Sequence, residues 1–380
     1  MRCDEQRAAR PSLPRTIMTA PATWQLTHTF PQLRCPPRLA LGQWPTPVDT
    51  FRLHWEGRTT ALWVKRDDRC SPLYGGNKVR KLELLLADAS AKGHRTVWTV
   101  GAVGSNHCLA TAIMAEHVGL SSNILHFPQP PSPVVTRNLC AIAATNANLD
   151  LAALPVMTAN LLRHHIRNWL SVQAQKTYYI PAGGSSPLGA LAFVEAAAEL
   201  QRQIDAGLLP LPQRIYVAAG TCGTFAGLWL GCALLELPIE VIGVRVVDRV
   251  ICHRRLVKNL AAQILGLLRD HHVRSPAREL VRRPLRLLHD HFGRGYGQAT
   301  PEGVAAIEAM AAAGGPQLEP TYTGKALAGA LRDCALRPPK GPVLFWNTYN
   351  SRPLTTLDLA QCRSRVPSPY HPFLDTSPHP

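Results

Sequence analysis

The chain has 380 residues, enough for two domains or for one large unit of helices and strands around buried cores. Hydrophobic residues make up 46% of it and charged residues only 17%, which excludes a disordered chain and a long charged helix. The formal net charge of +16 raises the question of a nucleic-acid or other anionic partner.

The N-terminal region, residues 1–30, is predicted to be an irregular tail. Its first twenty residues contain acids and lack an apolar core segment, so no secretory signal is expected, and Met18 is an alternative start. The ten cysteines of the chain form no CxxC pair and are scattered from Cys3 to Cys362. That distribution is typical of free thiols in a reducing cytoplasm.

Strand-like and helical runs alternate over most of the chain, which indicates an α/β fold with a largely parallel sheet. In chain order we predict a strand at 96–100, a helix at 106–118, a strand at 178–181, a helix at 188–204, and strands at 240–247 and 343–346. The charge-free run 215–235 is long enough to span a membrane, but a glycine-containing loop interrupts it. Strand, loop and helix is therefore the better interpretation, with no membrane span.

Half of the net charge lies in residues 245–294, which contain twelve basic residues and four acidic ones. Apolar residues recur there at helical spacing, so the arginines are predicted to lie on a solvated helical face (Leu256, Leu260, Ile264, Leu267, Leu268). No zinc-finger spacing or RNA-binding aromatic signature accompanies them. We therefore expect neither a nucleic-acid partner nor a metal site. The proline-rich stretch 363–380 is predicted to be an unstructured C-terminal tail.

Two loops before predicted helices have the composition of a ligand site. In parallel α/β sheets ligands bind at the carboxyl ends of the strands. Residues 220–224 read Gly-Thr-Cys-Gly-Thr, a loop whose backbone N–H groups and hydroxyls suit an anion, although it matches neither GxxxxGK[ST] nor GxGxxG. Residues 104–107, Gly-Ser-Asn-His, form a second polar loop. Taken alone, the first loop indicates only a tight turn between a strand and a helix.

The third feature is Lys78, which directly follows a Gly-Gly-Asn turn at the start of a helix. A lysine presented into a cleft beside a helix N-terminus has a lowered pKa and becomes a better nucleophile and base. A reactive lysine, an anion loop and a polar loop together suggest a pyridoxal phosphate enzyme. Such an enzyme needs a Schiff-base lysine, a phosphate cradle, and groups that contact the ring and the substrate carboxylate.

In these motifs the chain resembles the D-cysteine desulfhydrase and 1-aminocyclopropane-1-carboxylate deaminase family. That family belongs to the tryptophan-synthase-β-like, fold type II pyridoxal phosphate enzymes. The resemblance covers about residues 40 to 355 and is carried, in the family's order, by KRDD (65–68), GGNKVRKLE (75–83), VGAVGSNH (100–107), PAGGS (181–185), GTCGTFAGL (220–228), GYG (295–297), YTGK (322–325) and Asn347-Thr348. It implies two open, mostly parallel sheets flanked by helices. A large cofactor domain (31–83 and 190–362) would carry an inserted small α/β domain (84–189), and the enzyme would be a cytoplasmic homodimer.

The resemblance also implies the site residues. The positions that match the catalytic groups are Lys78, Ser105, Tyr296 and Tyr322. The positions that match the contacts to pyridoxal 5'-phosphate are Asn77, Lys78, Lys81, Asn106, Gly220, Thr221, Cys222, Gly223, Thr224, Thr323 and Thr348. Those that match the substrate side are Ser105, Asn106, His107, Gly184 and Tyr349. Three of these residues have a simpler interpretation: Lys81 as a helix-surface residue, Ser105 as a helix N-cap and Tyr296 as a turn residue.

Two positions bear on the substrate. The deaminase branch carries a glutamate and a leucine where this chain has Thr323 and Thr348, as in the desulfhydrase branch. A carboxylate near the ring nitrogen favours its protonation and strengthens the electron sink, and a neutral hydroxyl does so less. Opening a cyclopropane demands more of that sink than expelling a β-thiol. The resemblance therefore favours β-elimination that yields pyruvate, ammonia and sulfide from a small amino acid.

The chain also departs from the family pattern. Gly104 stands in place of a glutamine, Leu109 and Ala110 in place of an arginine and a glutamine, and Tyr349 and Asn350 in place of two glycines. The last two side chains are predicted to fill part of the pocket. Two other substrates stay open as a result: 1-aminocyclopropane-1-carboxylate, and another β-substituted amino acid such as a sulfonate. A non-catalytic basic binding protein on the same fold is the alternative of a different class.

Overall fold

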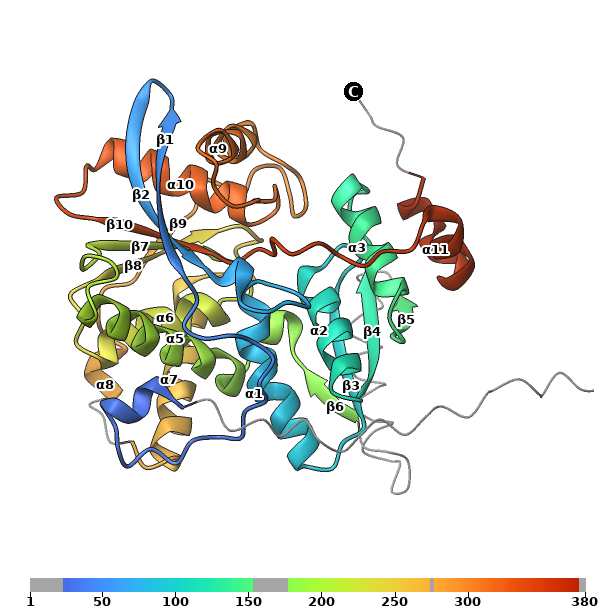
Figure 1. Ribbon diagram of the computed structural model, residues 1–380, viewed down its shortest axis with the longest axis horizontal. Helices are drawn as coiled ribbons and strands as arrows, with labels where there is room; N and C mark the ends of the chain where they lie inside the picture. Colours follow the sequence, from blue (N-terminus) through green and yellow to red (C-terminus); the bar gives the residue numbers. More distant parts are fainter. Residues whose placement is uncertain (1–22, 153–176, 274–276, 376–380) are drawn as a thin grey trace, which may run out of the picture.

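The computed structural model describes residues 23–152, 177–273 and 277–375. The described chain forms two sheets with helices on their faces (Figure 1). The larger sheet has the order β1 (Val48–Trp55), β2 (Arg58–Arg66), β10 (Val343–Asn347), β7 (Arg214–Ala219), β8 (Glu240–Arg245), β9 (Arg286–Leu288). The smaller sheet has the order β5 (Asn148–Leu151), β4 (Ser121–Phe127), β3 (Thr96–Ala102), β6 (Thr177–Ile180). Every strand pair is parallel except the hairpin of β1 and β2, which confirms the predicted fold class.

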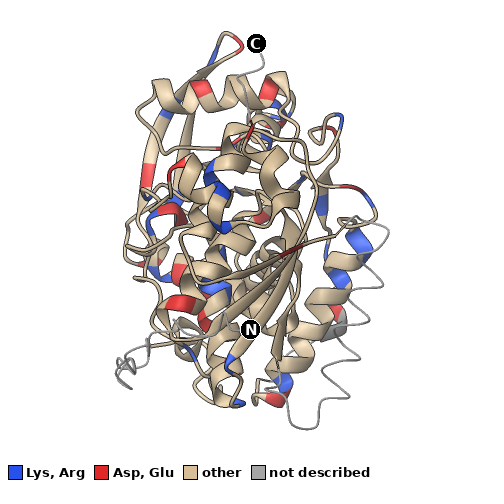
Figure 2. Ribbon diagram, turned by 90° about the vertical axis from the view of Figure 1, so that its right-hand side faces the viewer, with Lys and Arg blue, Asp and Glu red and all other residues tan. Residues whose placement is uncertain are grey.

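The helices cover the sheets because the strands alternate their side chains between two faces. On β10, Leu344 and Trp346 pack into one core and Phe345 into another. The first core lies under α5 (Pro187–Asp205), α6 (Gly223–Leu234) and α7 (Arg254–Asp270), and the second under α9 (Pro301–Ala312) and α10 (Thr323–Leu336). A third core joins the small sheet to α1 (Asn77–Ala91) and α2 (Asn106–His117). Charged residues lie mainly on helices and loops, and the strands between them carry few (Figure 2).

Most predicted elements are confirmed. The predicted helices at 106–118 and 188–204 are α2 and α5, and the run 215–235 is β7, a loop and α6. No helix in the described ranges is long and apolar enough to cross a membrane. On the basic helix α7, Leu260, Ile264 and Leu268 are buried while Arg255 is exposed, as predicted, although Leu256 is also exposed. The hairpin of β1 and β2 was not predicted.

The two predicted tails differ from the structure where the chain is described. Near the N-terminus, the buried Glu195 of α5 accepts the backbone N–H of Leu26 at 3.0 Å, and Leu26 is fully buried. At the other end, α11 (Leu359–Arg365) and a 3₁₀ helix (Ser368–Phe373) pack beside α3 (Pro133–Ala143), with Tyr370 fully buried (Figure 1). The prediction of an unstructured tail from residue 363 is therefore wrong. Proline ends helices but does not prevent apolar side chains from being buried.

The predicted division into domains is compatible with this arrangement. All strands of the smaller sheet lie between residues 96 and 180, within the segment 84–189 that was expected to form the inserted domain. Both proposed boundaries fall inside helices, α1 and α5, which also pack against each other. The boundaries of the two domains stay a prediction.

Candidate active site

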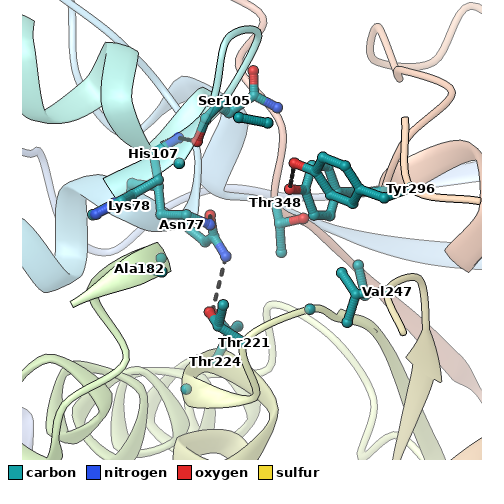
Figure 3. A pocket seen from close by; sticks show the side chains of 18 of the residues that line it. Asn77, Lys78, Ser105, His107, Ala182, Thr221, Thr224, Val247, Tyr296 and Thr348 are labelled. Carbon is teal, nitrogen blue, oxygen red and sulfur yellow. Dashed lines mark hydrogen bonds between the residues drawn. The ribbon is translucent and has the colours of Figure 1, made fainter. Parts of the chain in front are cut away.

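A cavity of about 510 Å³ lies where the strands of the two sheets end. Its lining comes from the turn before α1, the β3–α2 loop, the β7–α6 loop, the residues before α10 and the end of β10 (Figure 3). These segments meet because β3, β7 and β10 are parallel members of their sheets and present their carboxyl ends on one side. Of the predicted site residues, all but Gly184 line this cavity; its neighbour Gly183 does so instead.

The turn before α1 places Lys78 in the cavity. A side chain at Gly75 would lie 1.9 Å from the Asp68 carbonyl oxygen, and Gly76 has a φ of +95° that favours glycine. Lys78 follows as the second residue of α1 and donates a hydrogen bond from Nζ to Asn77 Oδ1 at 2.8 Å. Burial lowers the pKa of Lys78 to about 8, so a larger fraction of the amine is neutral and nucleophilic near neutral pH than in an exposed lysine.

The β7–α6 loop has the features of a phosphate cradle. It stands at the N-terminus of the twelve-residue helix α6, and Thr224 accepts a hydrogen bond from Asn77 Nδ2 at 2.9 Å (Figure 3). Thr221 and Ser185 share a hydrogen bond of 2.7 Å, and the Gly223 N–H donates to Ser185 at 3.2 Å. Backbone N–H groups, hydroxyls and a positive helix end fit the phosphate of pyridoxal phosphate.

Lys81 places a buried amine beside this loop. It is 2% exposed, so it is not the helix-surface residue of the simpler interpretation. Its Nζ donates to the Gly183 carbonyl at 2.9 Å, and a side chain at Gly223 would lie 2.8 Å from it. Burial, and next the charge of Lys78, lower the pKa of Lys81. An anion bound in the loop would favour the charged form of Lys81.

The β3–α2 loop presents three polar residues. Ser105 is the N-cap of α2 and accepts the N–H of His107 at 3.2 Å, so its simpler interpretation holds while it also lines the cavity. Asn106 accepts a hydrogen bond from Asn138 Nδ2 at 3.0 Å. His107 Nε2 pairs with Thr99 at 2.9 Å, and burial lowers the pKa of His107 well below its ordinary value, which keeps the ring neutral.

Two tyrosines lie opposite the lysine-bearing turn. The hydroxyls of Tyr296 and Tyr322 are 2.5 Å apart, and their rings meet edge to face. Burial raises the pKa of both phenols, so both are protonated and one proton of the pair is free to be donated into the cavity. Tyr296 thus lines the cavity and is not only a turn residue.

Sequence reasoning missed Glu319, a buried carboxyl group in the lining. It accepts the backbone N–H groups of Thr321, Tyr322 and Thr323 at 2.8, 2.7 and 2.9 Å, and so orders the start of α10. The sequence signal that could have identified it is an acid just before the first residues of α10, where capping groups occur. Tyr74, the aromatic residue before the Gly-Gly turn, was also missed and lines the cavity.

Tyr349 and Asn350, the two departures from the family pattern after β10, have different surroundings. Tyr349 lines the cavity, and its hydroxyl accepts a hydrogen bond from Arg137 of α3. Asn350 is absent from the lining; its Oδ1 accepts the Gly75 N–H at 2.7 Å and so holds the turn before Lys78. Of the two side chains that were predicted to fill the pocket, only Tyr349 is therefore placed to do so.

Comparisons with known proteins agree with this geometry. Residues 39–348 match the model of the family described as "Pyridoxal-phosphate dependent enzyme". A protein of Klebsiella pneumoniae (strain 342) named D-cysteine desulfhydrase is 33% identical over 82% of this chain and 93% of its own length. An Arabidopsis thaliana protein named bifunctional D-cysteine desulfhydrase/1-aminocyclopropane-1-carboxylate deaminase, mitochondrial, is 32% identical over 82% of this chain and 75% of its own.

The solved structures show the same fold. A structure titled as an ACC deaminase homologue has a TM-score of 0.67 and 29% identity, and the match covers 84% of this chain and 94% of the other. An O-ureido-L-serine synthase has a TM-score of 0.54 and 16% identity over 89% of this chain and 96% of its own, which is a likeness of fold alone.

Proposed function

The chain belongs to the pyridoxal-phosphate dependent enzymes, and from this premise we propose that it is a lyase with D-cysteine desulfhydrase-like activity. It would remove the α-proton of a small amino acid and expel the β-substituent, so that pyruvate, ammonia and, from cysteine, sulfide are released. The observation that carries the proposal is that Lys78 and the loop 220–224 line one cavity. A homodimeric, cytoplasmic enzyme is part of the same proposal.

Each group in the cavity has a place in such a reaction. Bound pyridoxal phosphate would supply a covalent attachment for the substrate amine and a sink for the electron pair left at Cα. The loop 220–224 with Lys81 would hold its phosphate, and Asn77 would orient Lys78. Lys78, with its pKa of about 8, is suited to taking the proton from Cα and holding it at Nζ.

The remaining groups would act on the substrate. The loop of Ser105, Asn106 and His107 would receive the substrate carboxylate at the start of α2, where the helix dipole favours an anion. One phenol O–H of the protonated pair Tyr296 and Tyr322 would donate its proton to the departing sulfur. Glu319 would keep Tyr322 in place through the backbone of α10.

The test is a product assay with the purified protein after loading with pyridoxal phosphate. D-cysteine, L-cysteine, β-chloroalanine and 1-aminocyclopropane-1-carboxylate are offered separately, and pyruvate, sulfide and 2-oxobutyrate are measured. We expect sulfide and pyruvate from D-cysteine. If 2-oxobutyrate from the cyclopropane substrate is the main product, the chain is a deaminase. If the protein takes up no cofactor and binds DNA in moderate salt, the non-catalytic alternative is correct.

Tyr349 is expected to restrict the size of the β-substituent. Tyr349→Gly should shift the ratio of kcat/KM toward a bulky substrate, S-benzyl-D-cysteine over D-cysteine, by about tenfold, because an aromatic ring is removed from the cavity wall. Tyr349→Phe keeps the ring and should shift the ratio little. Asn350→Gly is the comparison for effects that act on both substrates alike, since Asn350 lies outside the lining but holds the turn before Lys78. An equal shift in the Tyr349→Gly and Asn350→Gly variants would show that Tyr349 does not select the substrate.

A further inference from the structure

Asn138 of α3 is a buried amide that contacts the β3–α2 loop without lining the cavity. It is 1% exposed and is absent from the lining. Its Nδ2 donates one hydrogen bond to the Gly104 carbonyl at 2.9 Å and a second to Asn106 Oδ1 at 3.0 Å. A primary amide has two N–H donors, so both protons of Asn138 are used on this one loop.

These two hydrogen bonds determine the orientation of the Asn106 amide. A backbone carbonyl only accepts hydrogen bonds, so the Gly104 contact requires the nitrogen of the Asn138 amide to face the loop. The same nitrogen donates to Asn106, which must therefore accept with its oxygen. Asn106 lines the cavity, and its Nδ2 makes no hydrogen bond to any residue that the structure describes. The N–H donors of Asn106 are thus left for a ligand.

Gly104 allows α3 to pack closely against this loop. A side chain at Gly104 would lie 2.8 Å from Cγ2 and 3.1 Å from Cα of Val135, three residues before Asn138 on the same helix. The glycine that replaces the family's glutamine thus keeps Asn138 within reach of the loop. Asn138 Oδ1 is buried and has no hydrogen-bond partner in the described ranges. A buried amide that leaves its own oxygen unpaired and donates twice to one loop is placed for that loop rather than for stability.

We propose that Asn138 is a positioning residue that makes Asn106 a hydrogen-bond donor to an anionic oxygen in the cavity. Two oxygens fit this description, the ring oxygen of pyridoxal phosphate and a carboxylate oxygen of the substrate. Either is stabilised by an N–H donor and would be repelled by the Asn106 oxygen if the amide were turned over. Asn138 acts in this way only if the proposed function holds, because the cofactor or an amino acid must occupy the cavity.

The test compares the full chain loaded with pyridoxal phosphate with its Asn138→Leu variant, which keeps the size of the side chain and removes both donors. The first measurement is the pH midpoint of the visible band without substrate. Loss of a donor to the ring oxygen should raise it by about one unit, because the donor stabilises the deprotonated form. The second is the affinity for alanine, which has no β-leaving group, relative to alaninamide, with both enantiomers of each. Loss of a donor to the carboxylate should lower this ratio by about tenfold.

A double-mutant cycle shows whether Asn138 acts through Asn106. Asn138→Leu should change the affected measurement in the wild-type background and leave it unchanged in the Asn106→Ala background. Asn106→Asp should cause a loss at least as large, since it keeps an oxygen towards Asn138 and replaces the donor by a second oxygen. Gly104→Ala should act in the same direction by moving α3 away from the loop. It breaks the contact by a second route if circular dichroism shows that Asn138→Leu is not folded.

Asn148 supplies the matched control. Its Nδ2 donates to Asn123 Oδ1 at 2.9 Å between β5 and β4, and neither residue lines the cavity. Asn148→Leu should therefore leave both measurements within about twofold of the wild type. The proposal is overturned if neither measurement changes in Asn138→Leu, or if the change is equal in the Asn106→Ala background.

The same measurements separate this proposal from the proposed function. A wild type that takes up no cofactor and binds no alanine would overturn both. A wild type that binds alanine but releases no pyruvate from D-cysteine would overturn the lyase activity alone, since neither measurement depends on turnover.

Discussion

Lys78→Ala is expected to abolish the visible absorption band of the cofactor-loaded protein and to lower turnover of D-cysteine by about 10³-fold or more. The physical reason is that one amine serves two purposes. Lys78 Nζ is the cavity amine held by Asn77, and burial lowers its pKa to about 8, which suits both attachment to the cofactor and proton transfer. Absorbance after dialysis measures the first role and pyruvate release the second.

Lys92 provides the control for this experiment. It lies at the far end of α1, its side chain is 59% exposed, and it pairs with Asp88. Lys92→Ala should therefore keep the band and the turnover within about twofold of the wild type. A Lys78→Ala protein that still shows the band and still releases pyruvate would mean that another amine holds the cofactor.

Glu199→Ala is expected to reduce the free energy of unfolding by about 3–5 kcal/mol. The Glu199 carboxylate of α5 accepts hydrogen bonds from Arg80 at 2.8 Å and from Lys65 at 2.6 Å, and both partners are buried. Arg80 retains its 2.7 Å contact with Asp67 in the variant, but Lys65 loses its carboxylate partner. A buried ammonium without a counter-charge costs several kcal/mol. Denaturant unfolding followed by circular dichroism measures the loss.

The same variant should alter the dependence of stability on pH. Arg80 and Lys65 hold the pKa of Glu199 well below its ordinary value, against the effect of burial. The stabilisation is therefore fully present above the pKa of an unfolded glutamate, about 4.3, and is lost as the pH falls towards the folded pKa. Glu199→Ala should flatten the stability profile below about pH 4.3.

An exposed ion pair supplies the matched control. Asp375 pairs with Arg363 at the surface, with side chains 60% and 44% exposed, so Asp375→Ala should change the stability by less than about 1 kcal/mol. If Glu199→Ala is no more destabilising than Asp375→Ala, the buried network does not hold α1 against α5. In that case the position of Lys78 must depend on the Gly-Gly turn alone.

Several features of the site could be predicted from short stretches of sequence. The Gly75-Gly76 turn admits no side chain, so the motif itself dictates where the helix bearing Lys78 begins. The run 215–235 encodes a strand, a turn and a helix by its own composition, and it thereby determines where the loop 220–224 lies. These features were predictable because each depends on neighbours within a few residues.

The remaining features depend on which distant segments meet. Composition indicated a disordered end after residue 363, but Tyr370 finds a buried position against α3. Tyr349 and Asn350 are adjacent and equally unusual, yet only the direction in which β10 ends decides that Tyr349 enters the cavity.

Sequence by itself thus determined the fold class, the cofactor family and the position of Lys78 at the start of a helix, because local turns and strand-and-helix alternation encode them. Tertiary structure alone decided the carboxylate that balances Lys65 and the wall opposite Lys78. Those contacts join residues far apart in the chain. Their energies come from burial and charge pairing that exist only once the sheets have packed.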